Sequence, residues 1–377
     1  MSYSNLSIER ANLSTNSCAV DNTEPLNALS IIRRLEKEKL PRLRSIDGNR
    51  KLLSFPMARV AFIIDDRSKE LRQLLDGLVV SKNAGKKGLA SNWLLKRSIQ
   101  VAAALPSWLL PTAKIHTPYQ FLSWRKGMRY RLIDLRNRSI LDWAKPGGEQ
   151  YVLREIHART NLSTKLFIPE LIHCDAEGQY FCHRLVDGAS LLAAPRAAGD
   201  RQSVLDRMFS GLRDLYGQTQ RAVVTTHYVD ELTEKVNRAS ALPERVRRTA
   251  LMLLNKELDR PKSTYLAQAH GDLNLGNIVW ERETSENYLI DWESTAEHSL
   301  LYDAFNLHIF VTHVHRIRSL DTHRYLRMPW SDSSEKTHLS FYRSLFFVER
   351  MLIWANNPNR DLRWIIMLDK IARTESL

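Results

Sequence analysis

The sequence predicts an α+β fold in which a small β-rich lobe is followed by a larger helical lobe. Between residues 118 and 188, short apolar runs and polar turns surround one helical segment, in the order β-β-α-β-β. From residue 189 onward, apolar residues recur mainly at helical spacing. One segment, 267–294, interrupts these helices with strand-like runs and acidic turns. These three observations together predict the fold class.

Composition and periodicity divide the chain into four expected regions. They are a flexible leader rich in Ser, Asn and Thr, an N-terminal region of unassigned role, the β-rich lobe and the helical lobe, at 1–28, 29–117, 118–188 and 189–377. The N-terminal region contains a strand-like apolar run at 60–64 and a helical pattern before Pro41. It carries no motif to which chemistry can be assigned.

The elements of the β-rich lobe follow in order. "RYRLIDLRNRSILDWAK" (129–145) predicts two strands around a polar turn. "PGGEQYVLREIHARTNL" (146–162) opens with a Pro-Gly-Gly break and continues as a helix. "IPELIHCDAEGQYFCHRLVDGASLL" (168–192) predicts two further strands and then an Asp-Gly break. Helices are expected afterwards at 204–219, 243–258, 301–317, 340–355 and 363–372.

The charge balance bears on partners. The 377 residues include 55 Lys and Arg against 42 Asp and Glu, a formal net charge of +13. Such an excess favours anionic partners, with an inert basic surface as the alternative. The basic residues form no dense tract or nucleic-acid motif, so no nucleic acid is expected as a partner. The most apolar stretch, 101–111, is too short and too interrupted by proline to span a bilayer. We expect it to pack on the main domain; the alternative is that 92–111 makes peripheral contact with an anionic membrane surface.

Three cysteines without a CxxC pair predict no disulfide framework and favour a reducing compartment. The N-terminal residues also lack the basic-then-apolar order of a signal peptide. We therefore expect a cytoplasmic protein, with a membrane-peripheral location as the alternative.

The segment 267–294 carries the chemistry. In "HGDLNLGN" (270–277), Asp272 and Asn277 lie in one loop, which suits a proton acceptor beside a ligand of Mg²⁺, an ion that prefers oxygen. In "YLIDWE" (288–293), a short strand delivers Asp291 at its end, where a carboxylate suits a bridge between Mg²⁺ and the phosphates of ATP. An ordinary hairpin with polar turns is the alternative for either piece alone.

The two pieces in this order match the catalytic frame of protein kinases, H-x-D-L-x-x-x-N followed by a metal-binding Asp. "HGDLNLGNIVW…YLIDWES" resembles the aminoglycoside phosphotransferase/choline kinase family, and Asp303 in "LYDAFNL" stands where that family has another Asp. The resemblance covers about residues 118–377. It implies a protein-kinase-like two-lobed fold that binds ATP between the lobes, with an additional N-terminal region here.

The resemblance also implies roles for individual residues. Asp272 is expected to deprotonate an acceptor hydroxyl, while Asn277 and Asp291 hold Mg²⁺. The fold asks for a Lys after the third strand paired with a Glu of the next helix, and Lys145 and Glu155 fall at these places. Glu149 is an alternative partner for the lysine, and a surface Lys with a solvated Glu is the plain alternative. His270 is expected to be structural, and Glu293 to be a neighbour of the metal site or a substrate contact.

The phosphate-covering loop matches poorly. "SWRKGMRYR" (123–131) contains one glycine, Gly127, and no GxGxxG, so Arg125, Lys126 and Arg129 become the candidates for phosphate contact through their side chains. "LVDGASL" (185–191) is similar to the adenine-binding hinge of the family, which makes Val186 and Gly188 candidate nucleotide contacts.

Gly271 stands where protein kinases have an Arg that senses a phosphorylated activation loop, and the 291–303 interval leaves no room for a long loop. A small-molecule hydroxyl is therefore the expected acceptor. "IDWESTAEHSLLYDAFNL" (290–307) is similar to kinase-like proteins of bacterial surface-polysaccharide synthesis, which favours a sugar or glycan acceptor. An aminoglycoside or choline-like amino alcohol is the second hypothesis, and a catalytically inactive kinase-like binding module is the third.

Overall fold

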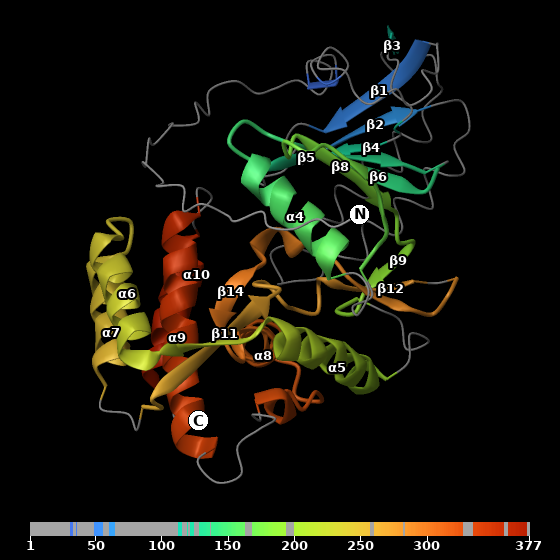
Figure 1. Ribbon diagram of the computed structural model, residues 1–377. Helices are drawn as coiled ribbons and strands as arrows, with labels where there is room; N and C mark the ends of the chain where they lie inside the picture. The colour runs from blue at the N-terminus through green and yellow to red at the C-terminus, as the bar shows by residue number, and fades with distance from the viewer. Residues whose placement is uncertain are drawn as a thin grey trace, which may run out of the picture.

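A computed structural model describes most of the chain from residue 119 onward and parts of the region before it (Figure 1). The described residues are 31–32, 35, 49–55, 60–64, 112–114, 119, 121–123, 128–135, 137–162, 168–193, 200–256, 260–281, 283–326, 335–357 and 361–374. Within them, a β-rich lobe is followed by a helical lobe, which confirms the expected two-lobed α+β architecture.

In the described part of the β-rich lobe, eight strands form an antiparallel sheet in the order β3-β1-β2-β4-β5-β6-β8-β7. Its strands are β1 (Asn49–Phe55), β2 (Val60–Ile64), β3 (Thr112–Lys114), β4 (Phe121–Ser123), β5 (Arg129–Asp134), β6 (Ser139–Ala144), β7 (Leu171–Cys174) and β8 (Tyr180–Arg184). The strands expected on either side of the polar turn are β5 and β6. The expected run at 60–64 is β2, and it pairs with β4, so the sheet continues across the expected boundary at 117/118.

Helix α4 (Glu149–Asn161) follows β6, precedes β7 and lies against this sheet, in agreement with the expected order β-β-α-β-β. Val152 is fully buried and packs with Phe181 of β8 and Ala144 of β6. The same face of the helix places Glu155 in the interior, where its side chain is fully buried. A carboxylate in such a place requires cationic or hydrogen-bonding partners, because an isolated buried charge is very costly.

The helical lobe packs six α-helices around two small sheets, within the described residues. The helices are α5 (Arg201–Thr219), α6 (Thr225–Arg238), α7 (Glu244–Asn255), α8 (Tyr302–Ile309), α9 (Glu335–Asn356) and α10 (Leu362–Thr374). Two short helical turns, Phe310–Val314 and His323–Leu326, lie between α8 and α9. Tyr342, Phe346 and Phe347 of α9 are almost fully buried, so this helix is the centre of the lobe's core.

Two three-stranded sheets carry the loops of interest. One has the order β10 (Arg221–Val224), β11 (Ser263–Ala269), β14 (Ala296–Ser299), and the other β13 (Asn287–Leu289), β12 (Ile278–Glu281), β9 (Gly188–Ser190). Loop 270–277 joins β11 to β12, and a short helical turn, Trp292–Ser294, follows β13. The strands and turns expected for 267–294 are thus confirmed.

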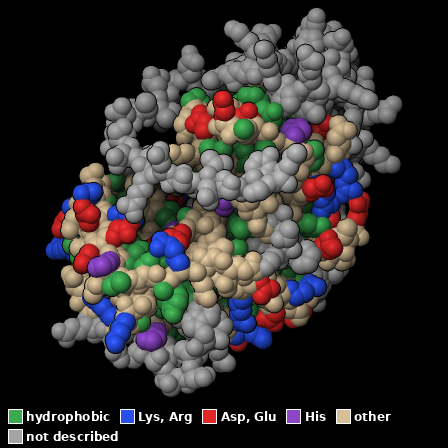
Figure 2. Space-filling model, viewed as in Figure 1, with side chains coloured by type: hydrophobic (Ala, Val, Ile, Leu, Met, Phe, Trp, Pro, Cys, Tyr) green, Lys and Arg blue, Asp and Glu red, His purple; other side chains and the backbone are tan. Residues whose placement is uncertain are grey.

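The surface gives no strong single-sign patch on the face shown in Figure 2, where acidic and basic side chains of the described residues are interspersed. No helix in the described part of the chain is long and apolar enough to cross a membrane. The leader 1–28 and the apolar segment 92–111 lie outside the described residues, so membrane contact stays a prediction.

Candidate active site

Asp303, near the start of α8, anchors loop 270–277 through hydrogen bonds. The fully buried carboxylate of Asp303 accepts hydrogen bonds from the backbone N–H of His270 (2.8 Å) and of Gly271 (3.0 Å). It also accepts one from the hydroxyl of Tyr216 (2.8 Å). Three donors on one buried carboxylate fix the loop rigidly, because charge-assisted hydrogen bonds are stronger than neutral ones.

Within this loop, Asn277 and Asp272 come together as expected. The amide Nδ2 of Asn277 donates to the backbone carbonyl of Asp272 (2.9 Å), which turns the amide oxygen of Asn277 away from that contact. The Asp272 side chain remains about one-third exposed, at 35%. An accessible carboxylate therefore lies beside an amide oxygen whose orientation is fixed.

A residue that the sequence did not single out, Arg350 of α9, orients Asp272. Its Nη2 donates to Asp272 Oδ1 (2.8 Å), and its Nη1 donates to the carbonyl of Gly271 (2.9 Å). Arg350 is itself buried, with 9% of its surface exposed. The only signal in the sequence is a charged pair, Glu349 and Arg350, inside the apolar run "LFFVERMLIWA".

The two loops of the site are tied to each other by backbone contacts. The N–H of Ile290 donates to the carbonyl of Asn277 (2.9 Å), and His270 Nε2 lies 2.9 Å from the carbonyl of Ile290. His270 is fully buried, and its ring packs against Trp292. These contacts give His270 the structural role expected for it, and they place Asp291 next to loop 270–277.

Gly271 lies where the two loops approach most closely. Its φ of +81° is a backbone conformation that favours glycine. A Cβ added there would lie 2.8 Å from the carbonyl carbon of Ser294 and closer still to its oxygen. The chain therefore requires glycine at this position for the approach of the loops, in addition to lacking the arginine of protein kinases.

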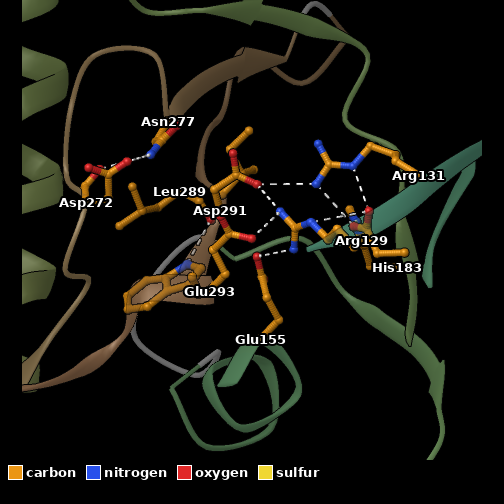
Figure 3. Close-up of polar contacts among 12 residues, drawn as sticks. Arg129, Arg131, Glu155, His183, Asp272, Asn277, Leu289, Asp291 and Glu293 are labelled. Carbon is orange, nitrogen blue, oxygen red and sulfur yellow. Dashed lines mark hydrogen bonds and ion pairs between the residues drawn. The ribbon is translucent and has the colours of Figure 1, made fainter. Parts of the chain in front are cut away.

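Asp291, in the helical lobe, contacts two arginines of β5 in the β-rich lobe (Figure 3). Its Oδ1 accepts from Arg129 Nη2 at 2.5 Å and from Arg131 Nη2 at 3.3 Å. Burial alone would raise the pKa of Asp291, but the two guanidinium groups outweigh it and hold the pKa below its ordinary value. The carboxylate is thus ionised at neutral pH, and its Oδ2 lies outside these two hydrogen bonds.

The partners of Glu155 are arginines rather than the expected lysine. Glu155 Oε1 accepts from Arg129 Nη1 (3.0 Å), and its Oε2 accepts from Arg159 Nη2 (3.1 Å). The ammonium of Lys145, one residue beyond the end of β6, lies 5.4 Å from the centroid of the Tyr130 ring. The expected position of Glu155 on the helix is right, and its observed cation comes from the neighbouring strand β5.

Glu293 completes the acidic side of the site. Its Oε2 lies 3.6 Å from Arg129 Nη2. Arg129 would lower the pKa of Glu293, but burial and the charges of Asp291 and Glu155 outweigh this effect and raise it. Figure 3 shows Arg129 between Glu293, Asp291 and Glu155, so one guanidinium is surrounded by several carboxylates.

The remaining nucleotide candidates have mixed outcomes. Gly127 lies outside the described residues, as do Arg125 and Lys126. Val186 is half-buried in the connection between β8 and β9. Gly188 begins β9, and a Cβ there would lie 2.7 Å from the carbonyl carbon of Trp280 on β12, so sheet packing alone explains this glycine.

Solved structures similar to this chain include three phosphotransferases. A GDP complex of aminoglycoside 2'-phosphotransferase-IIIa has 16% sequence identity over 67% of this chain and 91% of that chain, with a TM-score of 0.46. Choline kinase LicA from Streptococcus pneumoniae has 15% identity over 67% and 90%, with a TM-score of 0.45. Macrolide 2'-phosphotransferase type I has 13% identity over 70% and 93%, with a TM-score of 0.45.

No protein-family model matches the sequence, and no curated protein is similar to it in sequence. Two of these solved structures are an aminoglycoside phosphotransferase and a choline kinase, the two kinds of protein that the motif at 270–291 resembles. Their identity to this chain is low, so the chemistry of the site rests on its own residues.

Proposed function

We propose that this chain is a Mg²⁺- and ATP-dependent phosphotransferase that moves the γ-phosphate of ATP to a hydroxyl group of a small molecule. The observation that carries the proposal is the convergence of Asp272, Asn277 and Asp291 from two loops joined by hydrogen bonds. Arg129 and Arg131 of β5, in the β-rich lobe, contact Asp291. Phosphoryl transfer requires this combination of a proton acceptor, oxygen ligands for a metal and cations for phosphates.

The residues present fit Mg²⁺ with bound nucleotide. Among the described residues, no group of three or more His, Cys, Asp or Glu forms a cage that would hold a metal by itself. Mg²⁺ commonly binds through one or two carboxylates together with waters and substrate phosphates. Asp291 Oδ2 and the amide oxygen of Asn277 are two oxygens of the right kind, and both lie outside the hydrogen bonds described above.

The residues of the chain would act by positioning and by charge. When bound, Mg²⁺ would neutralise charge on the transferring phosphates. Asp272, oriented by Arg350, would accept the proton of the acceptor hydroxyl and aim that oxygen at the γ-phosphate. The link between Ile290 and Asn277 would keep the two metal ligands in register. Positioning of this kind accounts for much of the acceleration in phosphoryl transfer.

For the acceptor, we propose a sugar or glycan hydroxyl, as in a surface-polysaccharide pathway. Two features support this choice over an aminoglycoside: the similarity of residues 290–307 to kinase-like proteins of such pathways and the net charge of +13, which disfavours a polycationic substrate. An amino alcohol of the choline type is the second candidate.

Transfer of radiolabelled γ-phosphate from ATP to sugars, amino alcohols and aminoglycosides tests the proposal. We expect the wild type to label an acceptor and Asp272→Ala to lose labelling while it still binds ATP, because Asp272 is not a phosphate contact. Normal turnover by Asp272→Ala would rule out its role as the base. Absence of both transfer and ATP binding in the wild type would favour the binding-module hypothesis.

A further inference from the structure

Strand β5, rather than the end of β6, carries the cations that contact Asp291. Arg129 and Arg131 lie two residues apart on β5, so their side chains leave the same face of the sheet. Both contact Oδ1 of Asp291. A protein-kinase-like site is expected to draw its phosphate-binding cation from the third strand of the kinase-like region, which begins near residue 118, and that strand is β6 here.

On β6, the residue that lies beside Arg131 is an acid. Asp142 is paired directly with Arg131 in the β5–β6 ladder, and it is fully buried. Its carboxylate accepts from Arg131 Nε (2.8 Å) and Nη2 (3.2 Å), while Arg129 Nε lies 3.6 Å away. Asp142 thus anchors the two arginines, so β6 presents a negative charge beside them, while the expected Lys145 lies beyond the end of β6.

The two arginines differ in what they can reach. Arg129 is nearly buried, at 9% side-chain exposure, and it joins Glu155 of α4 to Asp291. Arg131 is 31% exposed and uses Nε and Nη2 in its bonds to Asp142 and Asp291, which leaves Nη1 outside them. A guanidinium held on one side and open on the other is well suited to bind phosphate.

We propose that Arg131 is the residue that contacts the nucleotide phosphates and that Arg129 is a positioning residue that links Glu155 to Asp291, so that β5 takes over the role expected of Lys145. This inference rests on the proposed function and deepens it. It places the phosphate cation on the strand next to the expected one, with Asp142 as its anchor.

Binding of Mg²⁺-ATP and of adenosine to purified variants tests the proposal. Loss of a charge-assisted contact predicts that Arg131→Met weakens Mg²⁺-ATP binding by about ten- to a hundredfold. Adenosine affinity should not change, because adenosine has no phosphate. Lys145→Met should give a smaller loss than Arg131→Met. Arg221→Met, in an exposed ion pair on β10 of the helical lobe, serves as the matched control and should bind both ligands like the wild type.

A second variant guards against misfolding, because Arg131→Met leaves Asp142 with fewer partners. Arg131→Lys keeps the charge but loses the planar fork, so its ATP affinity should lie between those of the wild type and Arg131→Met. Arg129→Lys should lower the rate of ATP hydrolysis more than the affinity for ATP, as expected of a positioning residue. The thermal unfolding temperature of each variant verifies that it is folded.

Three results would overturn the inference. One is a larger loss of ATP affinity in Lys145→Met than in Arg131→Met. Another is an equal loss of ATP and adenosine affinity in both Arg131 variants, which would indicate a purely structural role. The third is failure of the wild type to bind Mg²⁺-ATP at all, which rejects the proposed function as well; the first two leave that function standing.

Discussion

Replacing Gly271 by alanine should separate the two loops of the site. The φ of +81° costs a non-glycine residue about 1–2 kcal/mol. The new Cβ would also lie 2.8 Å from the carbonyl carbon of Ser294, and relieving such overpacking costs about 1–3 kcal/mol. We therefore expect the free energy of unfolding of Gly271→Ala to fall by about 2–5 kcal/mol.

The catalytic effect of this substitution follows from what must move. Ser294 ends the turn that begins after Asp291, so displacing it shifts the metal carboxylate relative to Asp272. A shift of about 1 Å in a positioned group lowers turnover by roughly a hundredfold. Urea denaturation followed by circular dichroism measures the stability, and Mg²⁺-ATP hydrolysis measures the turnover.

Gly217→Ala provides a matched control with the opposite sign. Gly217 is exposed inside α5, and among the described residues nothing lies within 4 Å of the added Cβ. Alanine should raise the free energy of unfolding by about 0.5–1 kcal/mol there. If Gly271→Ala matched the wild type within about 0.5 kcal/mol and kept full turnover, the close approach of the two loops would be refuted.

Three further predictions concern residues around the site. Asp303→Asn removes an acceptor from buried N–H groups and should lower the free energy of unfolding by about 3 kcal/mol in urea denaturation; an unchanged midpoint would contradict it. Arg350→Met frees Asp272 and should lower the hydrolysis rate by roughly ten- to a hundredfold while ATP affinity, measured by calorimetry, stays the same; a matching loss of affinity would argue against a positioning role. Burial, with help from nearby His323, lowers the pKa of His308 to about 4, so the folded state resists its protonation. The unfolded chain binds that proton first as pH falls below about 6.5, so stability should drop by about 2 kcal/mol between pH 7 and pH 5. In His308→Gln, stability should no longer drop by this amount between pH 7 and pH 5. An unaltered dependence of stability on pH would refute the prediction.

The chemistry of the loops could be predicted because it is local. Asp272 and Asn277 share one loop, and Asp291 follows a strand in the same hairpin, so their spacing alone brings them together. Glu155 was also predictable, since its helix follows a recognisable Pro-Gly-Gly break. In each case a short stretch of sequence contains all of the information needed.

The partners of these residues could not be predicted, because they depend on strand register and on the approach of the lobes. Arg129 meets Asp291 from 162 positions away, and Arg350 meets Asp272 from 78. In the sequence, a lysine that follows one strand and an arginine in the strand before it are equally good cations. In the structure, arginines of β5 contact Asp291, and this arrangement is the basis of the proposal that β5 supplies the phosphate cation.

Gly188 illustrates the opposite difficulty. The similarity of residues 185–191 to a nucleotide-binding hinge suggested a ligand contact at Gly188. The close approach of its backbone to Trp280 explains the glycine through packing alone. Sequence similarity does not distinguish a glycine required for ligand contact from a glycine required for packing, because both requirements select the same residue. Its contact with nucleotide stays a prediction.

The most direct test of a Mg²⁺–nucleotide site is calorimetric titration of ATP with and without Mg²⁺ into the wild type, Asp291→Asn and Asp272→Asn. We predict that Mg²⁺ strengthens ATP binding to the wild type and to Asp272→Asn, and that Asp291→Asn loses this gain. Equal ATP affinity with and without Mg²⁺ in the wild type, or a gain that persists in Asp291→Asn, would contradict the proposed role of the two loops.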